Sequence, residues 1–274
     1  NRIPKTNIKN LINYLNQRIQ NFLLERNKLH KLSNLFMNNL NILFMKYIYK
    51  KSILFYAGEN LFNPNKYLKI ISIHTMDFDF FIKDKKLTKD KKFISFIDQY
   101  LDNHPDFSSN SKKTLVTKKN YYKSINKFFS FLEKKLKKKV VIAIHPRAPF
   151  DDSRFEDKEK FFYDTYNTVK NSELVVTSYS TAVNFICIHK KPAIFIYTDE
   201  IAKNRPNFVE RIKFFAETFG TIAVNIDDHK ISNLDNFLKI NEKKYDQYFV
   251  KYISDNKDIN YLFWEKVILE LEKY

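Results

Sequence analysis

Short apolar runs recur along the chain from residue 93 to residue 226, and polar residues separate them. Their length and their content of β-branched and aromatic residues are typical of strands buried on both faces of a sheet. The runs predict five strands, which are Phe93–Ile97, Val140–Ile144, Glu173–Thr177, Ala193–Tyr197 and Thr221–Ile226.

Apolar residues three and four positions apart predict helices between these strands. The expected helices are Asn120–Leu136, a helix through Phe161, Phe162, Tyr166 and Val169, then Ala182–Ile188 and Phe208–Phe219. We expect a charged loop at Asp151–Lys160 and two C-terminal helices, the last with Asp258 as its N-cap. Strands that alternate with helices predict an α/β fold with a doubly wound parallel sheet and right-handed crossovers.

The first part of the chain has a different pattern. Apolar faces at helical spacing predict mainly helices over residues 1–50, and Ser52–Ala57 and Leu68–His74 are candidate strands. The charged segment Lys83–Lys92 carries no turn motif and is the expected boundary. The predicted organisation is a helical, basic N-terminal region, residues 1–90, and a second domain, residues 91–274, that contains the sheet and the C-terminal helices.

The chain is strongly basic. Its 274 residues include 48 Lys and Arg against 31 Asp and Glu, a net charge of +17, which favours anionic partners. Residues 1–51 contain ten of these basic residues and a single acid, Glu25. Such a segment either lies on an anionic membrane or is the solvated face of ordinary helices, and the sequence leaves both open. No zinc-finger, RNP or helix-turn-helix pattern is present, so nucleic acid is not an expected partner.

Residue usage excludes several other kinds of site. With 2 glycines, the chain has no glycine-rich phosphate-binding loop of the dinucleotide or P-loop type. The single cysteine, Cys187, is typical of a reducing compartment, and the cysteine and histidine positions give no zinc-ligand spacing. No apolar run approaches the roughly 20 residues that a membrane-spanning helix needs.

Polar side chains stand at the carboxyl ends of the predicted strands, where ligands bind in open α/β sheets. These side chains are Asp98, His145, Ser178 and Asp199. Pro146 ends its strand because it cannot donate to a sheet ladder. The imidazole of His145 and the guanidinium of Arg147 suit an anionic ligand such as phosphate. The plainer interpretation is a buried strand that runs into a surface loop.

The segment Ser178-Tyr179-Ser180-Thr181 precedes a predicted helix. Ser180 or Thr181 is placed to cap Ala182–Ile188, and the free N–H groups of a helix N-terminus attract anions. The hydroxyls of Ser178 and Ser180 would add donors to phosphate oxygens. The alternative is that Ser180 or Thr181 only caps the helix.

Three segments together resemble a known family. Ile144-His145-Pro146-Arg147, Val176–Thr181 and Lys191–Phe195 are similar to the donor half of bacterial GT-B-fold glycosyltransferases. They look most like bacterial sialyltransferases, polysialyltransferases and Kdo transferases, which build capsule and lipopolysaccharide from CMP-activated sugars. The resemblance covers about Phe93–Asp227 and implies that residues 91–274 form a Rossmann-like nucleotide-sugar-binding domain. The nucleotide-binding residues that it implies are His145, Pro146, Arg147, Ser178, Ser180 and Thr181.

The same resemblance implies a catalytic base. Members of these families carry an acidic pair followed by Gly at one strand end, where this chain has Asp98, with Gln99 in place of the second acid and no Gly. We therefore expect inverting transfer in which Asp98 takes the proton of an acceptor hydroxyl, without a metal or another cofactor. If Asp98 is not the base, His74, His104 and Asp199 are the alternatives.

The resemblance also implies partners. They are the nucleotide-sugar donor, a glycan or lipid-linked glycan acceptor, and the inner face of the cytoplasmic membrane, where we expect a cytoplasmic, peripheral protein. The motifs resemble CDP-glycerol and CDP-ribitol phosphotransferases of teichoic acid synthesis almost as well, so polyol-phosphate transfer stays open. So does a catalytically inactive basic module that docks on a membrane or on partner enzymes. The sequence indicates no oligomeric state.

Overall fold

The computed structural model describes residues 40, 43, 48, 52–61, 64–84, 93–104, 115–150, 153–155, 157–228, 234–255 and 259–273. The predicted N-terminal helices, residues 1–50, therefore lie outside the described residues except at three helical positions. The chain divides into two compact units, Asn1–Phe55 with Leu61–Ile71, and Tyr56–Asn60 with Ser72–Tyr274. Helix α3 (Met76–Lys83), which was not predicted, belongs to the second unit. Among the described residues, no helix is long and apolar enough to cross a membrane.

Two short strands precede α3. They are β1 (Ile53–Ala57) and β2 (Lys69–Ile73), which pair in a two-stranded sheet, with the 3₁₀ turn η1 (Pro64–Lys66) between them. Both strands fall within the segments that the apolar pattern marked as strand candidates.

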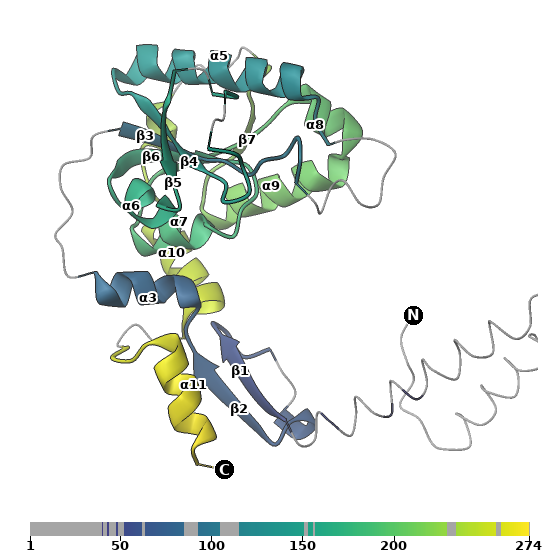
Figure 1. Cartoon of the computed structure of the whole chain (residues 1–274), viewed down its shortest axis with the longest axis vertical. Coiled ribbons are helices and arrows are strands. Elements are labelled where there is room, and N and C mark those ends of the chain that lie inside the picture. The colour runs from purple at the N-terminus through teal and green to yellow at the C-terminus, as the bar shows by residue number, and fades with distance from the viewer. Residues whose placement is uncertain are drawn as a thin grey trace, which may run out of the picture. The chain divides into compact units, whose positions relative to one another are not determined.

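A second sheet contains six strands, all parallel, in the order β5-β4-β3-β6-β7-β8 (Figure 1). The strands are β3 (Phe93–Ile97), β4 (Val140–Ile144), β5 (Glu159–Phe162), β6 (Ser172–Thr177), β7 (Ala193–Tyr197) and β8 (Ala223–Asn225). The first strand of this sheet, β3, lies at its centre. The chain then runs outward through β4 and β5 and returns to β6 on the other side of β3. This is the strand order of dinucleotide-binding folds, in which ligands bind at the carboxyl ends of the strands where the order reverses, here between β3 and β6.

Helices cover both faces of this sheet. Helix α5 (Lys118–Leu136) lies on one face, and α6, α7 and α9 lie on the other (Figure 1). Right-handed crossovers that leave the centre in opposite directions require this division. The remaining helical elements are α6 (Thr165–Lys170), α7 (Val183–Ile188), α8 (Asp199–Asn204), α9 (Pro206–Thr218), η2 (Asp235–Phe237), α10 (Glu242–Tyr248), the π-helical turn η3 (Phe249–Ile253) and α11 (Phe263–Leu271). The α/β class and the parallel sheet flanked by helices are confirmed.

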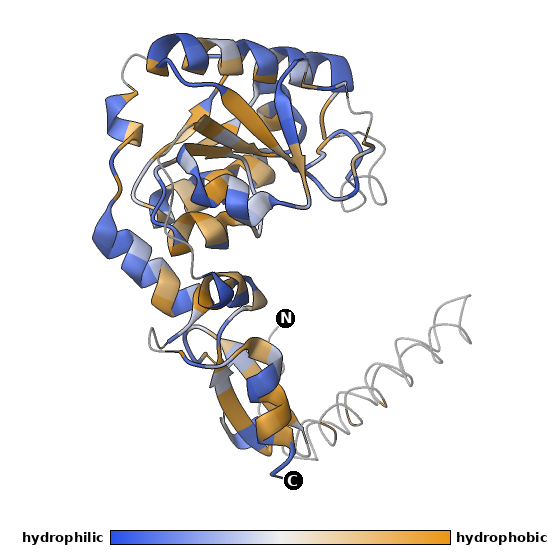
Figure 2. Ribbon diagram, turned by 60° about the vertical axis from the view of Figure 1, so that its left-hand side comes forward, coloured by the Kyte–Doolittle hydropathy of each residue, from blue (hydrophilic) through white to orange (hydrophobic). Residues whose placement is uncertain are grey.

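The core lies between the sheet and these helices. All five residues of β4 are buried, as its continuous apolar run predicts. Helix α5 buries an aromatic face against the sheet, and the rings of Phe129 and Phe96 meet with their centroids 5.1 Å apart. Each fully buried side chain of this size stabilises the fold by about 1.5–3 kcal/mol. Figure 2 shows hydrophobic strands in the sheet and a mixture of hydrophobic and hydrophilic residues along α5.

Two predicted elements are wrong between residues 151 and 170. Glu159–Phe162 is strand β5, where we expected a charged loop and the start of a helix through Phe161 and Phe162. The helix begins only at Thr165. Strand β5 is at the edge of the sheet and pairs with β4 alone, and edge strands carry charged residues such as Glu159 and Lys160 that hide the strand pattern.

Two other helix starts differ from the prediction. Helix α8 begins immediately after β7, because the Thr198 hydroxyl accepts the N–H of Ile201 at 3.2 Å and caps a helix that was not predicted. The last helix, α11, starts at Phe263, and the predicted cap Asp258 lies outside the described residues. There the Glu265 carboxylate accepts the N–H of Leu262 at 2.8 Å, which fixes the start of the helix.

Candidate functional site

The carboxyl ends of β3, β4, β6 and β7 lie along one edge of the parallel sheet, so Asp98, His145, Ser178 and Asp199 follow strands at the same edge. The structure joins two of them directly, since the N–H of His145 donates to Oδ2 of Asp98 at 3.3 Å. Asp199 is tied to the end of β8 instead. Its carboxylate accepts from Asn225 at 2.6 Å, and its N–H donates to Asp227 at 2.9 Å.

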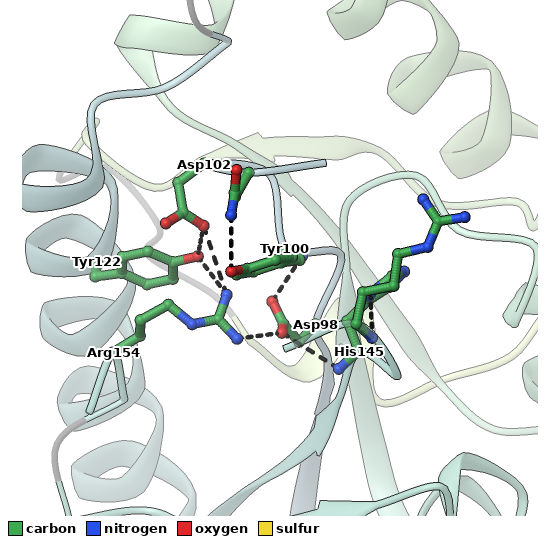
Figure 3. A network of polar contacts seen from close by, with 8 residues as sticks. Asp98, Tyr100, Asp102, Tyr122, His145 and Arg154 are labelled. Carbon is green, nitrogen blue, oxygen red and sulfur yellow. Dashed lines mark hydrogen bonds and ion pairs between the residues drawn. The ribbon is translucent and has the colours of Figure 1, made fainter. Parts of the chain in front are cut away.

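Asp98 forms a buried ion pair that the sequence did not reveal (Figure 3). The Arg154 guanidinium lies 2.7 Å from Oδ2 of Asp98, and both side chains are 2 % exposed. The other oxygen, Oδ1, accepts the N–H of Tyr100 at 2.9 Å. Both carboxylate oxygens are therefore already engaged by donors.

Arg154 is held on several sides. Its guanidinium carbon lies 4.5 Å from the ring centroid of Tyr100 and 5.1 Å from that of Tyr122, distances typical of cation–π contacts. Nη1 of Arg154 donates to the Tyr122 hydroxyl at 2.7 Å, and this hydroxyl donates to Asp102 at 2.6 Å (Figure 3). Aromatic rings, the ion pair and hydrogen bonds thus fix a loop arginine in the interior.

This pairing decides what Asp98 does as placed. Burial raises the pKa of the Asp98 carboxyl, whereas the charge of Arg154 and the N–H groups of Tyr100 and His145 lower it. A carboxylate with bonded oxygens in the interior holds other groups in position. To accept a proton from an acceptor hydroxyl, Asp98 would have to weaken its bond to Arg154, which would leave that buried cation with the more distant Asp102, 3.6 Å away, as a counter-ion.

Tyr100 carries an unusual backbone at this edge. Its φ of 53° lies in the left-handed region, which is sparsely populated for residues other than glycine and asparagine. The bond from its N–H to Asp98 stabilises this turn, and its ring stacks near His145, with the centroids 6.2 Å apart. Strained backbone of this kind persists where the surroundings fix it and is concentrated at functional sites.

The segment His145-Pro146-Arg147 offers donors at the edge. Nδ1 of His145 accepts the N–H of Arg147 at 3.2 Å, so the neutral ring carries its proton on Nε2 and can donate there. Burial lowers the pKa of His145, which favours this neutral form at pH 7. Pro146 and Arg147 are exposed, and the ring of His104 meets that of His145 edge-on, with the centroids 5.4 Å apart.

Two exposed aromatic rings that the sequence analysis did not select flank this segment. Phe150 is 73 % exposed and Tyr163 is 68 % exposed, and their ring centroids lie 6.2 Å apart. The Tyr163 hydroxyl donates to the carbonyl of Pro146 at 3.2 Å, which holds the ring beside the predicted nucleotide-binding residues. The signal in the sequence was an aromatic residue shortly after a strand, at Phe150 and at Tyr163.

The hydroxyl segment after β6 differs in detail from the expectation. Ser178 is 1 % exposed, whereas Ser180 is half-buried and Thr181 is exposed. Helix α7 begins at Val183 with Ala182 as its N-cap, so neither Ser180 nor Thr181 caps it. Oγ of Ser180 accepts instead the N–H of Ala182 at 3.2 Å, just before the helix.

The predicted anion site at the start of this helix is wrong in one respect. The N–H groups of Val183 and Asn184 already donate to the carbonyls of Ser180 and Thr181, at 3.3 and 3.2 Å, so they are not free. Gln99 joins the loops that follow β3 and β6, because its Oε1 accepts the N–H of Tyr179 at 2.9 Å. The accessible hydroxyls are those of Ser180 and Thr181.

The three alternative bases lie in different places. His74 is fully buried, with Nε2 2.7 Å from Oδ1 of Asp79, and it follows β2 rather than a strand of the parallel sheet. Asp199 is bonded at the end of β8, as described above. His104 is the one that contacts His145.

Comparison with known protein families and with curated proteins finds no match to this sequence. The arguments for a function therefore come from the fold and from this edge of the sheet.

Proposed function

We propose that the second unit is a GT-B-like donor-binding domain that binds a CMP-activated sugar at the carboxyl edge and transfers the sugar to a glycan acceptor. The observation that carries the proposal is the strand order, which reverses between β3 and β6, the place where sheets of this order bind ligands. The residues that the resemblance assigns to the nucleotide follow the strands along this edge. An α/β sheet alone hosts many functions, so the side chains at the edge make the proposal specific.

In this proposal the nucleotide phosphate lies near His145 and Arg147. The Nε2–H of neutral His145 and the guanidinium of Arg147 supply donors, and the hydroxyls of Ser180 and Thr181 add to them. Phe150 offers an exposed aromatic ring on which the flat face of the cytosine nucleobase could stack. Ser178 is buried, so its hydroxyl is not within reach of a ligand in this structure.

The transfer step needs a proton acceptor and stabilisation of the leaving group. The acceptor hydroxyl attacks the anomeric carbon, the bond from this carbon to the CMP phosphate oxygen breaks, and the hydroxyl proton passes to a base. His145 and Arg147 stabilise the negative charge that develops on the departing CMP. We assign the base to His104, because the bonded, buried carboxylate of Asp98 is a positioning group for the loops that carry Tyr100 and His145.

One observation favours a second candidate, a nucleotide-binding module without turnover. The expected base, Asp98, is committed to Arg154, so the chain could retain the binding edge without the chemistry. Polyol-phosphate transfer from CDP-glycerol or CDP-ribitol uses the same edge and remains the alternative within enzymes. In each case we propose that the protein acts at the inner face of the cytoplasmic membrane. The excess of basic residues in residues 1–51, ten against one acid, supports this location.

A thermal-shift series with CMP, CDP, UDP and GDP tests the proposal. A ligand that binds only the folded state stabilises it by about 2.7 kcal/mol at one hundred times its dissociation constant. We expect CMP and CDP to raise the melting temperature and UDP and GDP to have little effect. Stabilisation by UDP but not by CMP or CDP would contradict the proposal. Release of CMP from a CMP-sugar then separates the enzyme from the inactive module.

A further inference from the structure

A groove runs beside α9, outside the edge described above. One hollow of about 940 Å³ is lined by residues of α9, α10, η3 and Glu59. An adjoining hollow of about 430 Å³ is lined by residues of α9, α10 and η3 together with Tyr179. The two hollows share Phe214, Thr218, Tyr248 and Tyr252. Together they form what we term the α9 groove, and all of its lining residues belong to the second unit.

Aromatic side chains form its wall. The rings of Tyr179 and Phe215 meet edge-on with their centroids 5.1 Å apart, and those of Tyr248 and Tyr252 lie 4.8 Å apart. The Tyr248 hydroxyl donates to Oδ1 of Asn184 at 2.9 Å, so this ring is fixed. Phe214 is 54 % exposed and gives the groove an apolar ledge.

Cations without acidic partners line the same groove. Among the described residues, no carboxylate pairs with Arg211, Lys243, Lys244 or Lys251, and all four are exposed. Two of the acids that line the groove are paired elsewhere. Glu210 lies 3.0 Å from Lys213, and Asp246 lies 3.9 Å from Lys190. With Glu59 as the remaining acid, the groove favours an anionic ligand.

A π-helical turn fixes one side of the groove. In η3 the carbonyl of Lys251 accepts the N–H of Glu59 at 3.0 Å. Gly58, with a φ of 77°, allows this approach, because a Cβ there would lie 2.2 Å from the Lys251 oxygen. Single π-helical turns are rare and are found frequently at functional sites.

We infer that the α9 groove binds an anionic oligosaccharide, the acceptor of the transfer reaction. Its sugar rings would lie on the aromatic wall and the ledge of Phe214, and its carboxylate or phosphate groups would meet the lysines. This inference rests on the proposed function in one respect, which is the role of the glycan as acceptor. Tyr179 connects the proposed nucleotide site with the α9 groove. Its N–H donates to Gln99 at the end of β3, and its ring lines the groove.

A single-stranded nucleic acid is the competing ligand, since it too combines charge with rings. Nucleobases need ring faces open for stacking. The Tyr179 ring is packed between Phe208 and Phe215, with centroids 5.6 and 5.1 Å away, and Arg211 lies 6.0 Å above it. Of the rings that line the groove, Phe214 alone is exposed, so a row of stacked bases lacks the open faces it needs, whereas one exposed ring suffices for the apolar face of one sugar.

Calorimetric titration with defined probes tests this inference. The probes are a hexasaccharide of galacturonic acid, the neutral maltohexaose and an oligothymidylate. The variants are Lys243→Glu/Lys244→Glu, Phe214→Ala, and Lys118→Glu/Lys119→Glu, in the first turn of α5, as a matched control. The control pair is exposed on α5 and makes the same change in net charge outside the groove. Acidic residues in the first turn of α10 suit the helix dipole, so the groove variant should fold.

We expect the anionic hexasaccharide to bind wild-type protein at one site. Its affinity should fall at least about tenfold in each groove variant, an energy of about 1.4 kcal/mol, and should stay unchanged in the α5 control. Equal weakening by the α5 control, equal binding of maltohexaose, tighter binding of oligothymidylate, or no saturable binding overturns the inference. CMP titrations of the same variants separate the two proposals, because CMP binding should be normal in both groove variants. Absent CMP binding would refute the donor site alone.

Discussion

The two halves of the carboxyl edge are built in opposite ways. At the ends of β3 and β4, Asp98 and Arg154 are both 2 % exposed and satisfy each other within a shell of aromatic rings. At the end of β6, Ser180 is half-buried and Thr181 is exposed. The buried pair positions loops, whereas Ser180 and Thr181, like the exposed Arg147 after β4, keep polar groups within reach of a ligand. A carboxylate at a strand end is thus not a base by position alone, because its partners decide its role.

Breaking the buried Asp98–Arg154 pair should have the largest effect on stability. In Asp98→Asn the buried Arg154 loses its nearer counter-ion and retains Asp102, 3.6 Å away, so the free energy of unfolding should fall by up to about 3–5 kcal/mol in urea denaturation. The double variant Asp98→Asn/Arg154→Met removes the stranded charge and should recover part of this loss. If Asp98→Asn instead keeps wild-type stability and loses turnover, Asp98 is the catalytic base that the sequence predicted, and its pairing with Arg154 does not exclude that role.

The second prediction tests whether His104, rather than Asp98, is the general base. His104→Gln removes the imidazole beside His145 and should lower turnover of a CMP-sugar by about 10²–10⁴-fold, the usual contribution of a general base. Affinity for CMP should change little, because the proposed nucleotide contacts come from other residues. Turnover close to wild type in His104→Gln would remove it from the mechanism.

A half-buried imidazole away from this edge, that of His189, contributes to acid sensitivity. Burial, with the charges of Lys191 and Lys170, lowers the pKa of His189 from 6.5 to about 4. The folded state therefore binds this proton less readily than the unfolded chain. Stability should fall by about 1.4 kcal/mol for each unit as the pH drops from 6.5 to about 4, and this loss should be absent above pH 6.5.

Denaturation curves of wild type and His189→Gln across this pH range check the assignment. The variant should lose this part of the pH dependence, and the remaining acid sensitivity then belongs to other groups. An unchanged slope in His189→Gln would show that this imidazole is not responsible.

Much of the fold follows from local sequence, and the site follows only in part. Five strands of the parallel sheet are visible as apolar runs, because strands covered on both faces need apolar residues at every position. The edge strand β5 escaped, because its charged residues resemble a loop. His145 and Arg147 could be selected, because their place after a buried strand is a local pattern.

The partner of Asp98 could not be predicted. Arg154 is 56 residues away in the chain and lies in a segment that has the composition of a solvated loop. Its burial depends on rings from the loop after β3, from α5 and from its own loop meeting in space, which no spacing in the sequence encodes. The start of α7 was missed for a similar reason, since carbonyls rather than a side-chain cap satisfy its first N–H groups.

Titration calorimetry of CMP into wild type and His145→Ala tests the central claim most directly, namely that a cytidine nucleotide binds at the carboxyl edge. We predict saturable binding at one site in wild type. His145→Ala should weaken it by about 1.5–3 kcal/mol, the usual worth of a hydrogen bond to a charged group, while the melting temperature without ligand stays close to wild type. CMP binding of equal affinity in both proteins, or no saturable binding to wild type, would contradict the account.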